Sequence, residues 1–269
     1  MIIEGAFHKL HENLLMDSFP QEQYDAFLVG HMAMAILLEM SLRNEPYPAS
    51  HIRLEKPYGI AAKAGRKLRA DLFAETPLFG KLASKQCEAY GIAQDNWFEV
   101  KYFKRSAKSQ SGIPRQKNTR RIAIDLLRLC VLVEDSGDGA RFVLSVFENE
   151  PESYVALKTR DNKERHWLRQ ILTPGCHEIC LNSLEEPDIF QAKDGPLVLN
   201  ALIDVKAFIP VQNKLPGLYW GYLCNVINFK LSLGNQTIIH SPDDPIDKTQ
   251  AGRDAHLEVA RKLIDGLST

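Results

Sequence analysis

Apolar residues recur with two different periods along the first 150 residues. A long apolar stretch that ends before Pro46 predicts a helix at residues 21–43. Apolar residues at helical spacing predict a second helix at residues 119–133. Short runs rich in β-branched, aromatic or continuously apolar residues predict strands at 51–58, 67–73, 97–103 and 141–147. The expected order is therefore helix, three strands, helix, strand. A glycine-containing turn at 59–65 and a loop with a short helix at 77–92 connect them.

The pattern after residue 150 is less regular. It predicts helices at 162–172 and 256–267, and strands at 197–209 and 223–233. We expect an α/β (α+β) fold with a mixed central sheet flanked by helices. Residues 1–150 would form the core, and residues 151–269 an α+β extension that serves target recognition or dimerisation. A boundary near 149–153 and one continuous sheet are both compatible with the pattern.

Composition narrows the function classes only slightly. The chain has 269 residues, 45% of them hydrophobic, which suffices for a core without disulfides. A formal net charge of −1 excludes a uniformly basic protein, so any affinity for nucleic acid must come from local patches. Five scattered cysteines suit a reducing cytoplasm. Cys176, His177 and Cys180 have zinc-like spacing, but no second pair follows, and buried thiols are the default expectation.

The sequence lacks the patterns of a secretory signal, a membrane span and several classes of enzyme. The first 15 residues contain Glu4 and Glu12 and do not resemble a secretory signal, and the apolar run 26–42 is short for a bilayer, so we expect no membrane span. No glycine-rich phosphate loop, dinucleotide fingerprint or Gly-x-Ser-x-Gly elbow occurs, which disfavours a nucleotide cofactor and acyl transfer. The eight histidines are dispersed.

An acid-x-lysine tripeptide, Glu99-Val100-Lys101, lies on the third predicted strand. Residues two apart on a strand share a face, so the carboxylate and the ammonium should emerge together while Val100 packs the other way. Such a pair can serve phosphodiester hydrolysis, because the carboxylate ligates Mg²⁺ and the lysine positions the attacking water. A surface hairpin with solvated charges is the plainer alternative.

The spacing alone is weak, because it also occurs at Asp161/Lys163 and Asp204/Lys206. Context favours residues 99–101. Only there does a preceding strand carry an acid, Asp71, while a helix and a strand follow. Hard Mg²⁺ needs oxygen ligands from converging elements, which neighbouring strands supply.

This combination resembles the PD-(D/E)xK nuclease superfamily, which has the restriction-endonuclease-like fold, from Met1 to about Glu148. The acidic position of the family motif corresponds to Asp71, and its E-x-K to Glu99 and Lys101; Ala70 stands where the family usually has proline. The resemblance implies an αβββαβ core and Mg²⁺, with Mn²⁺ as a substitute. It also implies Asp71 and Glu99 as metal ligands, with the Val100 carbonyl as a further one, and Lys101 as the residue that positions water.

Some members of the superfamily place a metal-binding glutamate on the first helix. Glu39 is the acid within the apolar stretch 26–42, and a buried carboxylate needs a metal or a basic partner. A salt bridge to Arg43, or exposure at the helix rim, is the alternative to a metal-binding role.

Basic residues cluster directly after the motif. Residues 100–124 hold eight basic and no acidic residues. Besides Lys101, the members are Lys104, Arg105, Lys108, Arg115, Lys117, Arg120 and Arg121. Such a patch can neutralise phosphates and hold a nucleic-acid backbone over a metal site; a solvated loop is the alternative. A second group of basic residues, at 158–169, also contains Asp161 and Glu164 and is interpreted as an ordinary helix face or, at most, a secondary phosphate contact.

The residues and the resemblance together predict a cytoplasmic, Mg²⁺-dependent endonuclease that acts on DNA. The resemblance implies a restriction or another defence role, with repair and transposition as alternatives. The alternative is a non-catalytic nucleic-acid-binding or assembly protein that keeps the fold. A homodimer follows only from the task of cutting two strands. The four aromatic residues Tyr58, Trp97, Tyr102 and Phe103 are expected in the core rather than as base-stacking platforms.

Overall fold

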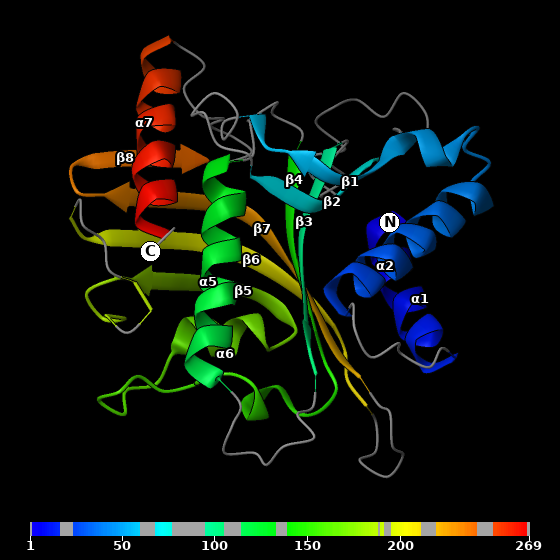
Figure 1. Cartoon of the computed structure of the whole chain (residues 1–269), viewed down its shortest axis with the longest axis horizontal. Coiled ribbons are helices and arrows are strands. Elements are labelled where there is room, and N and C mark those ends of the chain that lie inside the picture. Colours follow the sequence, from blue (N-terminus) through cyan, green and yellow to red (C-terminus); the bar gives the residue numbers. More distant parts are fainter. Residues whose placement is uncertain are drawn as a thin grey trace.

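The computed structural model describes residues 2–16, 24–59, 68–76, 95–104, 114–132, 139–187, 189–190, 195–210, 219–240 and 250–267. An eight-stranded mixed sheet lies at its centre, with helices on both faces (Figure 1). The expected α/β class with a mixed sheet flanked by helices is confirmed at this level.

The strands occur throughout the chain after the second helix. They are β1 (Ile52–Pro57), β2 (Arg69–Glu75), β3 (Asp95–Phe103), β4 (Gly139–Phe147), β5 (Gly175–Asn182), β6 (Leu197–Phe208), β7 (Trp220–Leu233) and β8 (Gln236–His240). The α-helices are α1 (Ile2–Met16), α2 (Tyr24–Leu42), α5 (Arg115–Leu132), α6 (His166–Ile171) and α7 (Gln250–Leu267). Within the described residues, the short 3₁₀ helices are η1 (Pro48–His51) and η3 (Pro151–Ser153).

The sheet runs in the order β1-β2-β3-β4-β7-β6-β5, and β8 pairs with the far end of β7. β3 and β4 are parallel and are connected through α5, whereas the other strand pairs are antiparallel. A parallel pair requires such a crossover connection. The strands after residue 150 extend the same sheet, because β7 pairs directly with β4.

The strongest patterns predicted their elements well. α2, α5, β3, β4, β6 and β7 lie where the apolar periodicity places them, with shifts of a few residues at the ends. α6 is shorter than the expected helix at 162–172, and α7 begins six residues before the expected 256. α1, β5 and β8 were not predicted. The connection expected at 77–92 and most of the turn at 59–65 lie outside the described residues.

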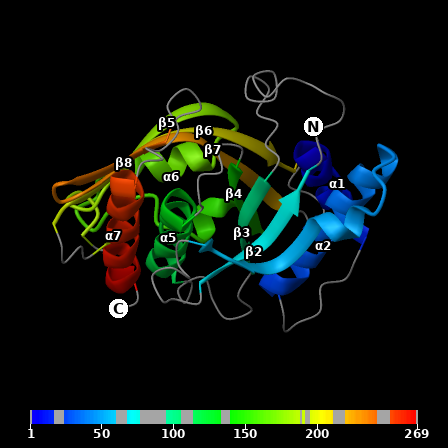
Figure 2. The ribbon, with the colours of Figure 1, turned by 90° about the horizontal axis from the view of Figure 1, so that it is seen from above.

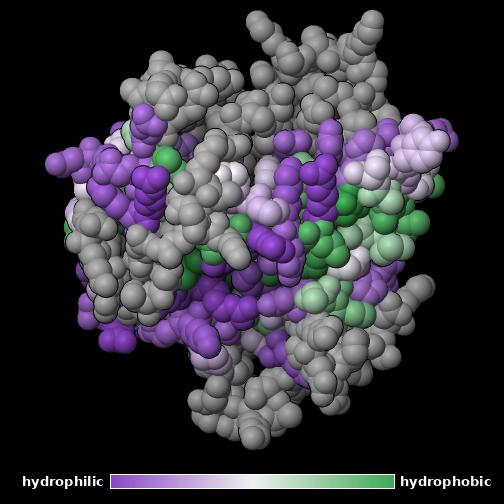
Figure 3. All heavy atoms as spheres, turned by 45° about the horizontal axis from the view of Figure 1, so that its top comes forward, coloured by the Kyte–Doolittle hydropathy of each residue, from purple (hydrophilic) through white to green (hydrophobic). Residues whose placement is uncertain are grey.

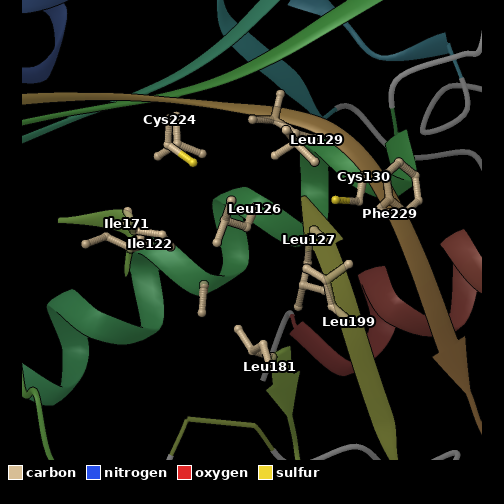
Figure 4. Close-up of a cluster of buried hydrophobic side chains, with 14 of the residues drawn as sticks. Ile122, Leu126, Leu127, Leu129, Cys130, Ile171, Leu181, Leu199, Cys224 and Phe229 are labelled. Atoms are coloured by element: carbon tan, nitrogen blue, oxygen red, sulfur yellow. The ribbon is translucent and has the colours of Figure 1, made fainter. Parts of the chain in front are cut away.

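The larger core lies between the sheet and helices α5, α6 and α7. Figure 4 shows how side chains of α5 meet side chains of the sheet and of α6 there, and the labelled residues are Ile122, Leu126, Leu127, Leu129, Cys130, Ile171, Leu181, Leu199, Cys224 and Phe229. His256 of α7 also joins α5 through a contact of 2.6 Å between its Nε2 and the Val131 carbonyl oxygen. α5 is thereby fixed over the centre of the sheet.

A second core lies on the opposite face, where α1 and α2 pack over β2, β3 and β4. Figure 2 shows the sheet between the α1/α2 pair and the α5/α7 pair. Residues 25–42 of α2 form an 18-residue window that is apolar enough to cross a membrane, and no other helix among the described residues passes that test. A core helix of a soluble protein passes it too, and the inner face of α2 is buried against the sheet.

The outer face of α2 is unusually apolar. Met34, Leu38 and Leu42 are exposed at four-residue spacing, and Figure 3 shows hydrophobic atoms on that side of the molecule.

Candidate active site

The sheet opens at the residues of the candidate motif. The antiparallel ladder between β2 and β3 runs from the pair Glu75/Asp95 to the pair Leu72/Phe98 and ends there. On the other side of β2, the ladder with β1 skips the position where Glu55 lies opposite Asp71, and Glu55 has a left-handed φ of 49°. Asp71 therefore lies where regular pairing is interrupted on both sides, and its side chain is available for other contacts.

The Asp71 carboxylate takes over the role of the missing strand partner. Its Oδ2 accepts a hydrogen bond of 2.7 Å from the Val100 backbone N–H. Asp25, from the start of α2, does the same one step further along: its Oδ1 accepts a 2.8 Å hydrogen bond from the Tyr102 N–H. Two carboxylates thus satisfy the N–H groups of β3 that β2 leaves unpaired, as buried donors require.

Glu99 and Lys101 share a face of β3, as the spacing predicts. Val100 packs into the α1/α2 core, whereas Glu99 and Lys101 lie on the side of α5. Both are buried, with Glu99 1% and Lys101 8% exposed. A hairpin with solvated charges is therefore not what these residues form.

The Lys101 ammonium is the meeting point of the cluster. Its Nζ lies 3.4 Å from Asp71 Oδ2, 3.7 Å from Glu99 Oε2 and 3.0 Å from the Val100 carbonyl oxygen. Asp71 and Glu99 thus approach one common position from neighbouring strands. The three residues of the motif and the carbonyl between them are brought together.

Asp125 is the member of the cluster that the sequence did not indicate. It lies on α5, is 1% exposed, and places Oδ2 3.1 Å from Lys101 Nζ. Arg128, one turn along the helix, lies 3.6 Å from Asp125 and 3.9 Å from Glu99. The only available signal was the position of Asp125 directly after the basic run, on a helix expected to cover the motif strand.

Burial and mutual repulsion make the cluster hold protons. Desolvation, reinforced by the nearby Asp125, raises the pKa of Glu99 to about 8 although Lys101 opposes the shift. Burial likewise raises the pKa of Asp125, against the attraction of Lys101. For Lys101, burial favours the neutral amine, but the three carboxylates outweigh it and raise its pKa. Near neutral pH the site therefore holds a charged lysine and a proton on the Glu99/Asp125 pair.

Tyr58 holds the Glu99 carboxylate in place through a hydrogen bond. Its hydroxyl donates a 2.7 Å hydrogen bond to Glu99 Oε1, and its ring stacks on Trp97. Burial and the neighbouring carboxylate raise the pKa of Tyr58 well above its usual value, so it stays a donor. Tyr58, Trp97, Tyr102 and Phe103 are all buried, as expected of core aromatics.

Glu39 is not brought to this cluster. It lies on α2, which covers the opposite face of the sheet from α5. Its carboxylate is bound by Lys9 at 2.7 Å and by Arg43 at 3.2 Å. The salt bridge to Arg43, which the sequence left open as the alternative, is present, and Lys9 of α1 adds a second one.

Four basic residues of α5 lie on one flank of the helix. Lys117, Arg120, Arg121 and Arg128 recur at spacings of one, three and seven residues, which places them on one outward flank of the helix beside the cluster. None of them is buried. Arg121 also binds Asp25 at 3.0 Å, so it is anchored beside the open edge of β3.

The remaining predicted contacts are more scattered. Arg115 is turned away from this flank, because its Nε donates to the Ser153 carbonyl. Lys104 is exposed just after β3. Arg105 and Lys108 lie outside the described residues.

The oxygen atoms present suit a hard divalent cation. Two carboxylates and a backbone carbonyl, which faces the edge that β2 leaves, form the donor set that Mg²⁺ prefers. In this arrangement they are ion-paired with Lys101, and no group of three or more His, Cys, Asp or Glu side chains among the described residues is spaced to hold a metal ion. The oxygen atoms therefore suit a divalent cation in their type and position, while Lys101 lies between them.

Other candidate features lie elsewhere. Asp204 and Lys206 of β6 form their own 3.2 Å ion pair, with Glu4 at 3.8 Å from the lysine. Cys176 and Cys180 are exposed free thiols on the edge strand β5. A groove of about 620 Å³ lies over β5–β8, with Asn200, Asn228 and Lys230 among its lining residues.

Comparisons with models of protein families, with curated proteins and with solved structures found no match to this chain.

Proposed function

We propose that the chain is a Mg²⁺-dependent endonuclease that hydrolyses phosphodiester bonds of DNA, with a restriction-endonuclease-like core. One observation carries the proposal. Asp71, Glu99, Lys101 and the Val100 carbonyl meet on one side of the sheet, at the point where β2 leaves β3. The chain order β1, β2, β3, α5, β4 after an initial helix agrees with the αβββαβ order that the resemblance implies for that core.

Each residue of the cluster has a distinct task. Asp71 and Glu99 would hold the cation, with the Val100 carbonyl as a third ligand. Lys101 would orient the attacking water and offset the charge that develops on the phosphate. Tyr58 keeps the Glu99 carboxylate in position through its hydrogen bond. Bound Mg²⁺ would supply Lewis-acid stabilisation of the phosphate and a water of lowered pKa.

The outward flank of α5 would bind the backbone of the substrate. Lys117, Arg120, Arg121 and Arg128 are all cationic and partly or fully exposed, and Arg128 also contacts the cluster. A row of cations beginning at the site fits a polyanion whose next phosphates lie along the helix. We place the protein in the cytoplasm, and assign target recognition or a dimer contact to the strands after residue 150.

The test compares Lys101→Ala with a matched lysine variant. Lys206→Ala removes a lysine with the same spacing from an acid, but on β6 and away from the cluster. Supercoiled plasmid and linear DNA are incubated with Mg²⁺ or with a chelator. We expect Mg²⁺-dependent cutting by the wild type and by Lys206→Ala, and a loss of at least about 100-fold in Lys101→Ala. Absence of cutting by a folded wild type, over a range of Mg²⁺ and Mn²⁺ concentrations, would contradict the proposal.

A non-catalytic nucleic-acid-binding protein is the second candidate. The observation that favours it is the saturation of Lys101 by carboxylates, which would let the cluster serve folding alone. Fluorescence anisotropy with labelled duplex distinguishes the two. Salt-sensitive binding without cutting supports this candidate, and Lys117→Ala should then reduce the salt slope by about one.

A further inference from the structure

The ammonium of Lys101 and a cation at the proposed site would use the same oxygens. Nζ contacts Asp71 Oδ2 at 3.4 Å and the Val100 carbonyl oxygen at 3.0 Å. Asp71 and the Val100 carbonyl are two of the ligands that the proposed function assigns to the cation. Mg²⁺ binds oxygen at about 2.0–2.1 Å, so two positive charges sharing both oxygens would repel each other strongly. Binding of the cation therefore requires Nζ to leave them.

One carboxylate of the cluster is placed to keep Lys101 when that happens. Asp125 Oδ2 lies 3.1 Å from Nζ and comes from α5, not from the strands that carry the expected ligands. α5 is fixed by its apolar residues, such as Leu126 and Leu129, which are fully buried in the core. The other carboxylate oxygen, Oδ1, lies 3.6 Å from Arg128. Asp125 thus has a rigid support and one oxygen within ion-pair distance of the lysine.

We propose that Asp125 is a positioning residue: it anchors the Lys101 ammonium, and so allows a divalent cation to replace that ammonium at Asp71 and the Val100 carbonyl. This inference rests on the proposed function, because it concerns the same site. It makes Lys101 an internal counter-ion of the cluster as well as the residue that orients water.

A purely structural role for Asp125 predicts a different behaviour. If Asp125 only balances the charge of a buried lysine, its loss changes the stability of the protein. Its effect on cation affinity is then the same with and without Lys101. If Asp125 anchors Lys101, its effect on cation binding must pass through the lysine. A double-mutant cycle separates these roles.

The experiment measures Mn²⁺ binding by isothermal titration calorimetry in four full-length proteins: the wild type, Asp125→Asn, Lys101→Met and the double variant. Asp125→Asn is expected to weaken Mn²⁺ binding by about tenfold, because an unanchored ammonium stays on Asp71 and Val100. Lys101→Met should bind Mn²⁺ more tightly than the wild type, because the competitor is gone. In the Lys101→Met background, Asp125→Asn should cause no comparable loss.

Turnover provides a second readout. Asp125→Asn should lower kcat for DNA cleavage at saturating Mn²⁺, because an unanchored Lys101 ammonium no longer orients the attacking water. Loss of folded enzyme would also lower the apparent kcat, so the rate is normalised to the concentration of folded protein measured by circular dichroism.

Three results would overturn the inference. Equal loss of affinity from Asp125→Asn in both backgrounds means that Asp125 acts on the cation directly. Unchanged or weaker binding by Lys101→Met removes the competition. Binding by none of the four proteins, with no cleavage, removes the proposed function and this inference together. If Asp125→Asn does not fold, as judged by circular dichroism, the comparison of wild type with Lys101→Met still decides the competition.

Discussion

Glu99 shows most clearly how burial determines the chemistry of single residues in this protein. A carboxylate that is 1% exposed would be ionised at neutral pH only if its partners compensated for the lost hydration. Lys101 and Arg128 compensate in part, but Asp125 adds repulsion, and the pKa of Glu99 rises to about 8. A cation at this site would therefore have to displace a proton as well as an ammonium.

The pH dependence of folding follows from that shift. Between pH 4.5, the ordinary pKa, and about 8, the native state binds a proton that the unfolded chain has lost. The free energy of unfolding should therefore fall as pH rises through this window and become level above it. Glu99→Gln should remove this contribution and be more stable than the wild type at pH 8, by on the order of 2 kcal/mol.

Urea denaturation at pH 5, 6.5 and 8 measures this effect. Glu178→Gln is the control, because Glu178 is exposed on β5. Equal pH dependence in Glu99→Gln and the wild type would contradict the prediction.

Part of the cluster could be predicted from the sequence, because its geometry is local. Glu99 and Lys101 share a face by the period of a strand, and Asp71 lies on the neighbouring strand. Asp125 and Tyr58 reach the cluster only through the packing of α5 and the path of the chain after β1, which no short spacing encodes. Glu39 was ambiguous for the same reason: only tertiary packing shows that Lys9 of α1 neutralises it.

At the scale of elements, the contact between β6 and β7 tests how tightly the second core is packed. Gly221 of β7 pairs with Phe208 of β6, and a Cβ at Gly221 would lie 2.0 Å from the ring of Phe208. That ring is also packed against Phe7 and His11 of α1. The strand pair and α1 leave the ring little room to move.

Gly221→Ala should consequently lower the free energy of unfolding by about 3 kcal/mol, the upper range for overpacking. Gly30→Ala is the matched control. Gly30 lies inside α2, a Cβ there would meet nothing within 4 Å, and alanine should stabilise the helix by roughly 0.5–1 kcal/mol. Thermal melts of both variants measure the difference. A melting temperature of Gly221→Ala equal to that of the wild type would show that the ring can yield.

The predictability of an element depended on the strength of its pattern. α5 has apolar residues at helical spacing and β4 has a nearly continuous apolar run, and both were predicted. β5 buries only Ile179 and Leu181 among polar residues, and β8 is five residues long, so neither has a distinctive period. α1 has apolar residues at helical spacing, such as Phe7, Leu10 and Leu14, so its sequence does contain a helical pattern although the helix was not predicted.

At the scale of the whole molecule, the continuous sheet makes the two halves of the chain interdependent. The free edge of β4 is covered by β7, and α5 packs on residues such as Leu199 and Phe229 from the second half. A fragment of residues 1–150 would expose both that edge and that core.

We therefore expect the fragment 1–150 to lack a cooperative unfolding transition, although it contains all the residues of the cluster. Circular dichroism melts of the fragment and of the full chain measure this. A sigmoidal melt of the isolated fragment would show that the core is independent of the strands that follow it.

The pairing of β4 with β7 also has a consequence in time. Phe147 of β4 can pair only after synthesis of Trp220 of β7, which the ribosome adds about 70 residues later. At about 5–20 residues per second, synthesis of that interval takes roughly 4–15 seconds. During this period a long apolar strand, from Ala140 to Phe147, has one unpaired edge and can pair with the same strand of a neighbouring nascent chain. Chaperone capture between synthesis of β4 and of β7 should determine how much of the newly made protein reaches its native sheet.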